Sequence, residues 1–284
     1  MKITKVEIIP VDIPRTKVLT LARYGNLGQG GKFEFVLTRI HTDEGISGVG
    51  EVPPLPPLSP ESQPVIVDVQ KKWLAPGLLG MDPFETEAIW EMMDFIAPTY
   101  SMAKAAIDIA LWDIMGKSLG MPVHRLMGGS KPEKIPNVGL IGIDEPEVVA
   151  DVAEEFVKGG YQGIRLKIAP DYDIDCVAAV RDAIGGGVDL RVDCNQGYRT
   201  HEAIKMIRNI EPYDIEFVEQ PTVWWDFNGM AEVAGSVDTP IMAHESMYLL
   251  SDVKNLIDAG AVGVMGLKTY RPWGGFTGAR RLPE

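Results

Sequence analysis

The second half of the chain carries four ionisable residues at a constant interval of 26 positions: Lys167, Asp193, Glu219 and Glu245. Each of them ends a short apolar run, and apolar residues at helical spacing follow each run. One strand and one helix of a parallel β/α barrel together take about 30 residues, which is close to this interval. The interval therefore predicts a barrel in which successive strands end in ionisable side chains.

A fifth apolar run, VMGLK, ends at Lys268. Parallel barrel strands present their C-terminal ends on one face, and enzymes with this architecture build their active sites there. We therefore expect three acids and two lysines to converge on that face, and the chemistry of the protein to be located among them.

Strand alternation indicates which of these side chains share a face. In GIRLKI, Arg165 and Lys167 lie on one side of the strand and aliphatic residues on the other. In LRVDCN the same rule groups Arg191, Asp193 and Asn195. Charges inside a barrel are costly unless they are paired or bound to metal. An internal layer of salt bridges and a metal site are therefore the two open explanations.

Three carboxylates at strand ends, those of Asp193, Glu219 and Glu245, predict a Mg²⁺ site, because this hard cation prefers oxygen ligands. Two histidines with one carboxylate would instead have indicated zinc or iron. The chain has four histidines, and only His244 stands near the motif. Mg²⁺ is therefore the expected cofactor, with Mn²⁺ as the alternative.

The first half of the chain is organised differently. Residues 2–13 alternate as a strand, and a hairpin turning at Gly45 follows. The segments 64–74, 83–96 and 101–119 carry apolar residues at helical spacing. Strands followed by helices predict an α+β domain.

Strands and helices alternate from residue 135 onward. Helical segments with acids near their starts and glycines at their ends separate the predicted strands. Six strands are predicted: NVGLIGI, GIRLKI, DLRVDCN, IEFVEQ, PIMAHES and GVMGLKT.

Two loops of the first half are candidates for closing over a ligand, although plain surface connections are the commoner role of such loops. They are the glycine-rich loop 23–31 and the proline-rich loop 53–61. The tryptophans at positions 224, 225 and 273 are expected to pack against other side chains rather than to stack on substrate.

Composition narrows the choice of partners. The 284 residues carry a net charge of −13, with a pI near 4.8, which argues against nucleic acid or an anionic membrane surface as the main partner. No stretch approaches the roughly 20 apolar residues of a membrane-spanning helix, and the N-terminus lacks the apolar core of a signal peptide. We expect a soluble, cytoplasmic protein that forms a homo-oligomer.

The ordered strand ends resemble those of a known family. The motifs RLK, DCNQGY, VEQP and AHES, followed by GLKTYRPWGG, resemble the enolase superfamily, specifically its mandelate racemase and muconate lactonizing enzymes. Residues 101–129 resemble the segment that precedes the barrel in those enzymes. The resemblance covers nearly the whole chain. It implies an α+β capping domain over residues 1–130 and a modified TIM-type β/α barrel over residues 131–284.

The resemblance also implies a mechanism and a small-molecule carboxylate substrate. Mg²⁺ would bind the substrate carboxylate, a base would remove the proton α to it, and the cation would stabilise the enediolate. Lys167 matches the base on the second barrel strand, and Lys268 matches the opposed lysine on the sixth. Lysines on both faces suit racemisation, epimerisation or cycloisomerisation of the muconate cycloisomerase type.

Arg165 and Asn195 are the expected substrate-binding residues. The family motif has lysine where this chain has Arg165, so the charge is kept but becomes permanent. A lysine acts as a base only when some of it is neutral, and a neighbouring cation lowers its pKa. Asn195 and Gln220 are suited to orient substrate or metal ligands, and structural hydrogen bonding is the alternative role.

Two departures from the family pattern leave alternatives open. The family usually has aspartate, its third metal ligand, where this chain has His244, so either Glu245 or His244 is expected to be that ligand. Strand alternation places these two residues on opposite faces. The chain also ends after six of the eight barrel strands, so we expect a barrel incomplete at its C-terminus.

Three functions fit these observations. The first is an isomerase acting through α-proton abstraction. The second is a dehydratase for acid sugars or hydroxy acids that uses the same site. The third is an inactive, truncated chain. A Schiff-base aldolase is disfavoured because the three acids would then have no role.

Overall fold

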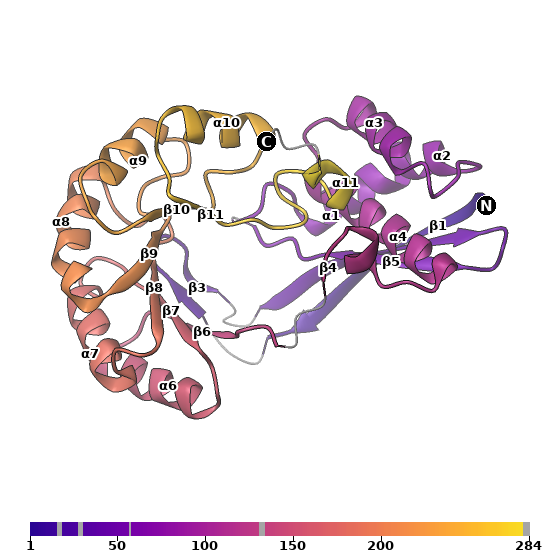
Figure 1. Ribbon diagram of the computed structural model, residues 1–284. Coiled ribbons are helices and arrows are strands. Elements are labelled where there is room, and N and C mark those ends of the chain that lie inside the picture. The colour runs from indigo at the N-terminus through magenta and orange to yellow at the C-terminus, as the bar shows by residue number, and fades with distance from the viewer. Residues whose placement is uncertain (16–18, 28–30, 57, 131–133, 281–284) are drawn as a thin grey trace.

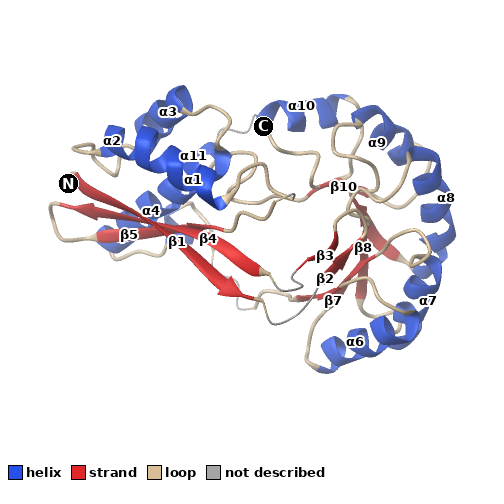
Figure 2. Ribbon diagram, turned by 180° about the vertical axis from the view of Figure 1, so that it is seen from behind, coloured by secondary structure: helices blue, strands red, loops and turns tan. Residues whose placement is uncertain are grey.

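The computed structural model describes residues 1–15, 19–27, 31–56, 58–130 and 134–280 (Figure 1). Parts of the two predicted ligand-closing loops, residues 28–30 and residue 57, lie outside this description, and so do the last four residues, 281–284. The described chain forms an N-terminal lobe and a curved β/α lobe (Figures 1 and 2).

A three-stranded antiparallel sheet forms one side of the N-terminal lobe. Its strands, in the order β1-β4-β5, are β1 (Ile3–Pro14), β4 (Lys32–Thr42) and β5 (Ser47–Val52). Gly45 turns the β4–β5 hairpin with a φ of 78°, a left-handed conformation that glycine adopts without steric cost. The predicted first strand and hairpin are therefore confirmed.

Helices cover one face of this sheet. They are α1 (Gln63–Val69), a π-helical turn (Gln70–Leu74), α2 (Ala75–Leu78), α3 (Thr86–Ile96), α4 (Ser101–Leu119) and α5 (Val123–Leu126). The three predicted helical segments are confirmed. Helix α4 lies against β5 so closely that a Cβ atom at Gly50 would stand 1.9 Å from the carbonyl oxygen of Ala106. Glycine at this position is therefore a packing requirement.

The second lobe is built on a six-stranded parallel sheet in the chain order of its strands. These are β6 (Val138–Ile141), β7 (Gly163–Lys167), β8 (Asp189–Asp193), β9 (Ile215–Glu219), β10 (Ile241–Ala243) and β11 (Val264–Met265). Each of the six predicted segments contains one of these strands. The sheet curves as an open arc with β6 and β11 at its edges (Figure 1).

Five helices line the outer face of this arc (Figures 1 and 2). They are α6 (Pro146–Lys158), α7 (Ile174–Ile184), α8 (Thr200–Ile210), α9 (Phe227–Ala234) and α10 (Leu250–Asp258). A short 3₁₀ turn, Glu211–Tyr213, follows α8. One hydrophobic core lies between these helices and the sheet, and a second fills the N-terminal lobe. No helix in the described ranges is long and apolar enough to cross a membrane.

Strand register explains part of the 26-residue interval. Lys167 pairs with Asp193 between β7 and β8, and Asp193 pairs with Glu219 between β8 and β9. The next pairing joins Glu219 to Met242, so Glu245 lies three positions beyond the register. The interval therefore marks equivalent strand ends for the first three residues only.

The prediction that Glu245 and Lys268 end strands is wrong. Strand β10 ends at Ala243, and Glu245 lies in the turn that follows. Strand β11 ends at Met265, and Lys268 lies in the next loop. Both strands are too short to carry the alternation of their residues as far as these side chains.

Two short segments connect the lobes. The hairpin of β2 (Leu19–Leu21) and β3 (Gly25–Leu27) lies beside the barrel strands, where the amide of Ile143 donates to the carbonyl oxygen of Thr20 at 3.2 Å (Figure 2). Helix α11 (Phe276–Ala279) returns to the N-terminal lobe and packs on α4. The strand ends of the barrel thus face the hairpin and the loops of the N-terminal lobe.

Candidate active site

Lys167 lies at the end of β7, inside the barrel, and is 5% exposed. Its neighbours on either side along the chain, Leu166 and Ile168, pack in the core under the helices, as strand alternation predicted. The ammonium of Lys167 donates to Asp193 Oδ2 at 2.5 Å and to Asn195 Oδ1 at 2.8 Å. Lys167 is therefore held by two acceptors from the end of β8.

Arg165 lies on the same face and binds two carboxylates. Its Nε and Nη2 atoms donate to the two oxygens of Glu219 at 2.7 and 2.5 Å, and Nη2 also donates to Asp193 Oδ2 at 2.5 Å. The internal layer of salt bridges considered from the sequence is therefore present. The guanidinium of Arg165 is thus engaged with the acids of the neighbouring strands, and its substrate-binding role stays a prediction.

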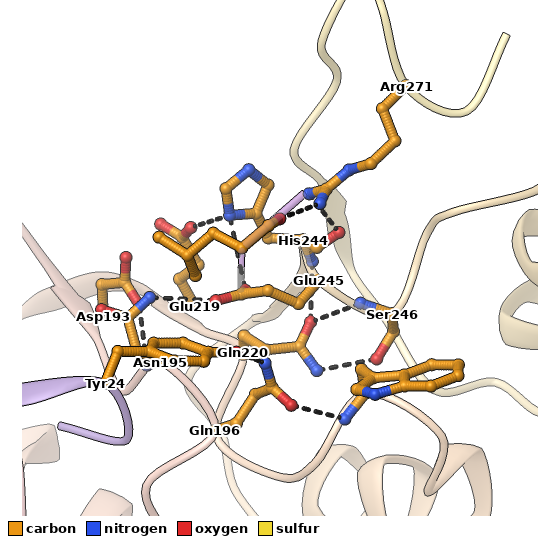
Figure 3. A network of polar contacts seen from close by, with 12 residues as sticks. Tyr24, Asp193, Asn195, Gln196, Glu219, Gln220, His244, Glu245, Ser246 and Arg271 are labelled. Atoms are coloured by element: carbon orange, nitrogen blue, oxygen red, sulfur yellow. Dashed lines mark hydrogen bonds and ion pairs between the residues drawn. The ribbon is translucent and has the colours of Figure 1, made fainter. Parts of the chain in front are cut away.

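His244 and Glu245 follow β10 in a turn, and both side chains face Glu219 (Figure 3). The Nδ1 atom of His244 lies 2.7 Å from Glu219 Oε1 and 3.5 Å from Glu245 Oε2. The prediction that the two residues point to opposite faces is wrong, because strand alternation stops at Ala243. Both residues can therefore belong to one site.

These three side chains form a group suited to a cation. One donor atom from each of Glu219, His244 and Glu245 lies within 4.8 Å of the others. His244 Nδ1 and Glu245 Oε2 are buried and have no partner at hydrogen-bond geometry within the described chain. Buried polar atoms without partners are rare, and two of them facing one another fit a bound metal ion. The residues present therefore fit a divalent cation.

Asp193 lies outside this group. It is fully buried, and its Oδ2 atom accepts from Lys167 and Arg165 while Oδ1 accepts from the amide of Asn195 at 2.9 Å. Burial raises the pKa of Asp193, and the charges of Lys167 and Arg165 oppose that shift. Of the three expected carboxylate ligands, the structure brings Glu219 and Glu245 together with His244, and it directs Asp193 toward the two cationic side chains.

The two carboxylates of the group are strongly acidic. Burial alone would raise the pKa of Glu219, but the contact with His244 and the charge of Arg165 hold it well below its usual range. Burial opposes ionisation of Glu245 also, and contact with His244 nevertheless lowers its pKa to about 2. Both groups are therefore carboxylates at neutral pH, as cation ligands must be.

Asn195 connects the predicted base to the group. Its side-chain oxygen accepts from Lys167, and its Nδ2 atom donates to Glu245 Oε1 at 3.0 Å. The residue has a φ of 40°, in the left-handed region that asparagine tolerates better than most residues. Asn195 thus faces protein groups on both ends of its carboxamide, which gives it a positioning role.

Gln220 holds the turn that carries His244. Its side-chain oxygen accepts from the amides of His244 and Ser246 at 2.9 and 3.0 Å, and its nitrogen donates to Ser246 Oγ and to the carbonyl oxygen of Thr222. The residue is fully buried. Of the two roles considered for Gln220, structural hydrogen bonding is the one observed.

The environment of Lys268 differs from that of the ion-paired Lys167. It lines a cavity of about 220 Å³ together with residues of β4 and of the proline-rich loop 53–61. Burial and the charge of Arg271 lower its pKa to about 8, although Glu245 acts in the opposite direction. Among the described residues its ammonium makes no ion pair. A lysine of this kind is partly neutral near physiological pH, as a general base requires.

Sequence reasoning assigned no role to Arg271 and Tyr24. Arg271 is buried and donates to the carbonyl oxygens of Leu58 and His244 at 2.9 and 3.0 Å (Figure 3). Tyr24 accepts a hydrogen bond from Gln196 Nε2, and burial raises its pKa to about 12. The motif GLKTYRPWGG and the loop 23–31 contain these residues, but neither pattern distinguishes them from their neighbours.

The three tryptophans differ in burial. Trp273 is buried. Trp224 and Trp225 are 38% and 55% exposed, and their rings pack edge-on against each other with centroids 5.4 Å apart. Trp224 packs edge-on against Tyr248, and both line a cavity of about 500 Å³ with loop residues of the N-terminal lobe.

Two family models match the chain. Residues 15–128 match the N-terminal domain of mandelate racemase / muconate lactonizing enzyme, and residues 148–283 match the enolase C-terminal domain-like model. The resemblance seen in the strand-end motifs therefore extends to both lobes.

Curated relatives are similar over most of this chain. A hydrophobic dipeptide epimerase of Enterococcus faecalis is 35% identical over 273 residues, which are 95% of this chain and 75% of that protein. An N-succinyl-L-Arg/Lys racemase of Bacillus cereus is 31% identical over 274 residues, which are 95% of this chain and 73% of that protein. Dehydratases and a cycloisomerase are also among the relatives.

Solved structures show the same fold. The Enterococcus faecalis dipeptide epimerase, complexed with Mg and the dipeptide L-Leu-L-Tyr, superposes with a TM-score of 0.92 at 34% identity, covering 98% of this chain and 77% of that one. A substrate-liganded L-Ala-D/L-Glu epimerase from Bacillus subtilis gives 0.92 at 31% identity, covering 99% and 78%. The chain therefore belongs to the mandelate racemase / muconate lactonizing enzyme family of the enolase superfamily, an enzyme family with a capping domain, a β/α barrel and isomerases among its members.

Proposed function

We propose that the protein is an epimerase or racemase that removes the proton α to a substrate carboxylate and returns a proton to the opposite face. The observation that carries this proposal is the contrast between two lysines of the barrel. Lys167 is buried and ion-paired with Asp193, whereas Lys268 has no ion pair among the described residues and a pKa lowered to about 8. The charges of Glu245, Arg165 and Glu219 contribute to the pKa of Lys268, and this supports assigning Lys268 to the same site.

The two lysines take complementary roles in this proposal. Neutral Lys268 accepts the α-proton on its side of the substrate. Lys167, which Asp193 and Asn195 hold in one position, supplies a proton on the other side. In the reverse direction the roles exchange, so one pair of residues handles both configurations.

Glu219, His244 and Glu245 would hold the divalent cation, which is Mg in solved structures of relatives. When bound, the cation neutralises the substrate carboxylate and stabilises the negative charge that develops as the α-proton leaves. The Lys167, Arg165 and Asp193 contacts keep charged side chains fixed around it, which limits the reorganisation that proton transfer requires.

We propose a dipeptide or another N-acylated amino acid as the substrate class. Relatives that act on hydrophobic dipeptides, on N-succinyl-L-Arg/Lys and on L-Ala-D/L-Glu support it, because each of these substrates has a carbon bearing both an amide nitrogen and a carboxylate. The cavity of about 500 Å³ lined by Tyr100, Trp224 and Tyr248 suits an apolar or aromatic side chain.

Proton exchange in D₂O tests this function. A panel of L,L- and L,D-dipeptides and N-acyl amino acids is incubated with the protein and a divalent cation, and ¹H NMR follows the α-proton. We expect deuterium at the carbon next to the carboxylate, together with the epimer. Elimination products would instead identify a dehydratase, and no exchange by folded, cation-loaded protein would contradict the proposal and favour an inactive chain.

Single-lysine variants test the division of roles. Lys167→Ala and Lys268→Ala should each abolish epimerisation, and each should retain exchange with only one of the two configurations. Lys254→Ala is the matched control, because this exposed lysine pairs only with Asp258 on the surface of α10 within the described chain. Equal loss of exchange with both configurations in both variants would argue against a two-base mechanism.

A further inference from the structure

The donor set of the candidate cation group differs from an all-oxygen site. Glu219 and Glu245 contribute carboxylate oxygens, and His244 contributes a ring nitrogen directed at both. Figure 3 shows the three side chains converging from the end of β9 and the turn after β10. An imidazole therefore stands where a third hard ligand would be expected.

Two atoms of the candidate cation group that make no hydrogen bond face one another. His244 Nδ1 and Glu245 Oε2 make no hydrogen bond in the described part of the chain, and Glu245 is only 1% exposed. Their close contacts are with the carboxylates of the group itself, Nδ1 lying 2.7 Å from Glu219 Oε1 and 3.5 Å from Glu245 Oε2. Leaving such buried atoms without hydrogen bonds costs free energy. A metal ion that accepts both oxygen and nitrogen would satisfy them at once.

The protein holds the imidazole in place through its backbone. Gln220 Oε1 accepts from the amide of His244, and Arg271 Nη2 donates to its carbonyl oxygen. Ser246, two residues on, is bound to the same glutamine. Fixed outer contacts of this kind are typical of residues that orient a metal ligand.

The remaining acid of the site is engaged elsewhere. Asp193 has one oxygen bound to Lys167 and Arg165 and the other bound to the amide of Asn195. Glu219 is ion-paired as well, through both oxygens to Arg165, but its Oε1 atom also lies 2.7 Å from His244 Nδ1. Asp193 is not among the described side chains whose donor atoms lie within 4.8 Å of one another, and Glu219, His244 and Glu245 are.

Mg²⁺ prefers six oxygen ligands, whereas the first-row transition-metal dications bind imidazole nitrogen readily. We propose that Glu219, His244 and Glu245 bind a first-row transition-metal dication in preference to Mg²⁺, with His244 Nδ1 as a direct ligand. This inference rests on the proposed cation site and adds the class of metal that occupies it.

Metal binding without substrate tests this inference. The full chain is titrated calorimetrically with Mg²⁺, Mn²⁺ and Co²⁺, and pulsed EPR of the Mn²⁺ complex detects any coordinated ¹⁴N. We expect Mn²⁺ and Co²⁺ to bind at least about tenfold more tightly than Mg²⁺ and the Mn²⁺ spectrum to show ¹⁴N coupling. Equal or tighter binding of Mg²⁺, or a Mn²⁺ complex without ¹⁴N coupling, would overturn the inference.

His244→Asp separates the imidazole from the rest of the site. The variant should lose the ¹⁴N coupling and most of its preference for Mn²⁺ and Co²⁺ over Mg²⁺. His201→Asp, at an exposed position on α8, is the matched control and should change neither. Retention of the coupling in His244→Asp would also overturn the inference, and the wild-type spectrum decides the question if that variant does not fold. These measurements need no turnover. Their outcome therefore tests the metal preference separately from the proposed isomerase activity.

Discussion

At the scale of single residues, side chains of the same type have different surroundings in this site, and their chemical roles differ accordingly. Lys167 and Lys268 are both lysines of the barrel, but only the first is ion-paired within the described chain. Glu219 and Asp193 are both buried acids at strand ends, but burial raises the pKa of Asp193, whereas at Glu219 the contact with His244 and the charge of Arg165 outweigh burial and lower it. The contacts of each lysine and each acid therefore distinguish roles that the residue type alone does not.

The pH dependence of exchange follows from Lys268. Because burial and Arg271 lower its pKa to about 8, the neutral form that accepts a proton is a minority below that pH and dominates above it. The rate of exchange that uses Lys268 as base should therefore rise with pH through about 8 and then level off. Measured kcat/KM against pH checks this, and a flat profile across that range would contradict the assignment.

Asn195 provides a second prediction at this scale. Asn195→Gly keeps the left-handed backbone and removes the carboxamide that joins Lys167 to Glu245. We expect cation affinity or exchange to fall by roughly 10-fold to 100-fold, as for other contacts that orient a metal ligand. Calorimetry and exchange kinetics check this, with Asn209→Gly on the exposed face of α8 as control. Unchanged values for both quantities would remove Asn195 from the site.

At the scale of elements, the sequence predicted most of what strands and helices determine. The 26-residue interval located β7, β8 and β9, because their ends pair in register. It failed at Glu245 because β10 has only three residues and the following turn is set by hydrogen bonds to Gln220. Such long-range contacts leave no local pattern in the sequence.

The surroundings of Trp224 and Arg271 could not be predicted for a related reason. Trp224 lines a cavity between the barrel and loops more than a hundred residues away along the chain. The position of Arg271 depends on a carbonyl oxygen of the N-terminal lobe. Periodicity indicates which face of an element is apolar, but it does not indicate which other element approaches that face.

The contact between α4 and β5 gives a stability prediction. Gly50→Ala places a methyl group 1.9 Å from the carbonyl oxygen of Ala106, so the strand must move away from the helix. We expect the free energy of unfolding to fall by about 1–3 kcal/mol or more. Urea denaturation measures it. Gly186→Ala, where a Cβ atom meets nothing within 4 Å, should leave it nearly unchanged. An equal effect of the two substitutions would contradict the packing argument.

At the scale of the whole molecule, contacts of α11 connect the last described part of the β/α lobe to the N-terminal lobe. Thr277 is fully buried, accepts from Trp112 Nε1 at 3.0 Å and donates its amide proton to Asp108 Oδ2 at 3.1 Å. The capping domain and the barrel are thus joined by contacts between α11 and α4, 165 residues or more apart in sequence. Their relative position fixes the two walls of the active site.

Thr277→Val tests this connection. The substitution preserves volume but removes the hydroxyl that accepts from Trp112, which leaves a buried donor unpartnered. We expect the free energy of unfolding to fall by about 1–3 kcal/mol. Thermal and urea unfolding measure the change, and near-ultraviolet circular dichroism follows the tryptophan. A variant as stable as the wild type, with an unchanged spectrum, would show that the contact contributes nothing to docking.

Arg271 connects the two lobes at the site itself. One guanidinium binds the carbonyl oxygens of Leu58, in the proline-rich loop, and of His244, in the candidate cation group. If His244 binds the cation as proposed, a shift of the loop would change the position of a donor to the cation, and a bound cation would favour one position of the loop. Thermodynamic linkage would make the two effects equal in size: whatever factor one loop position adds to cation affinity, the cation would add to the population of that loop position.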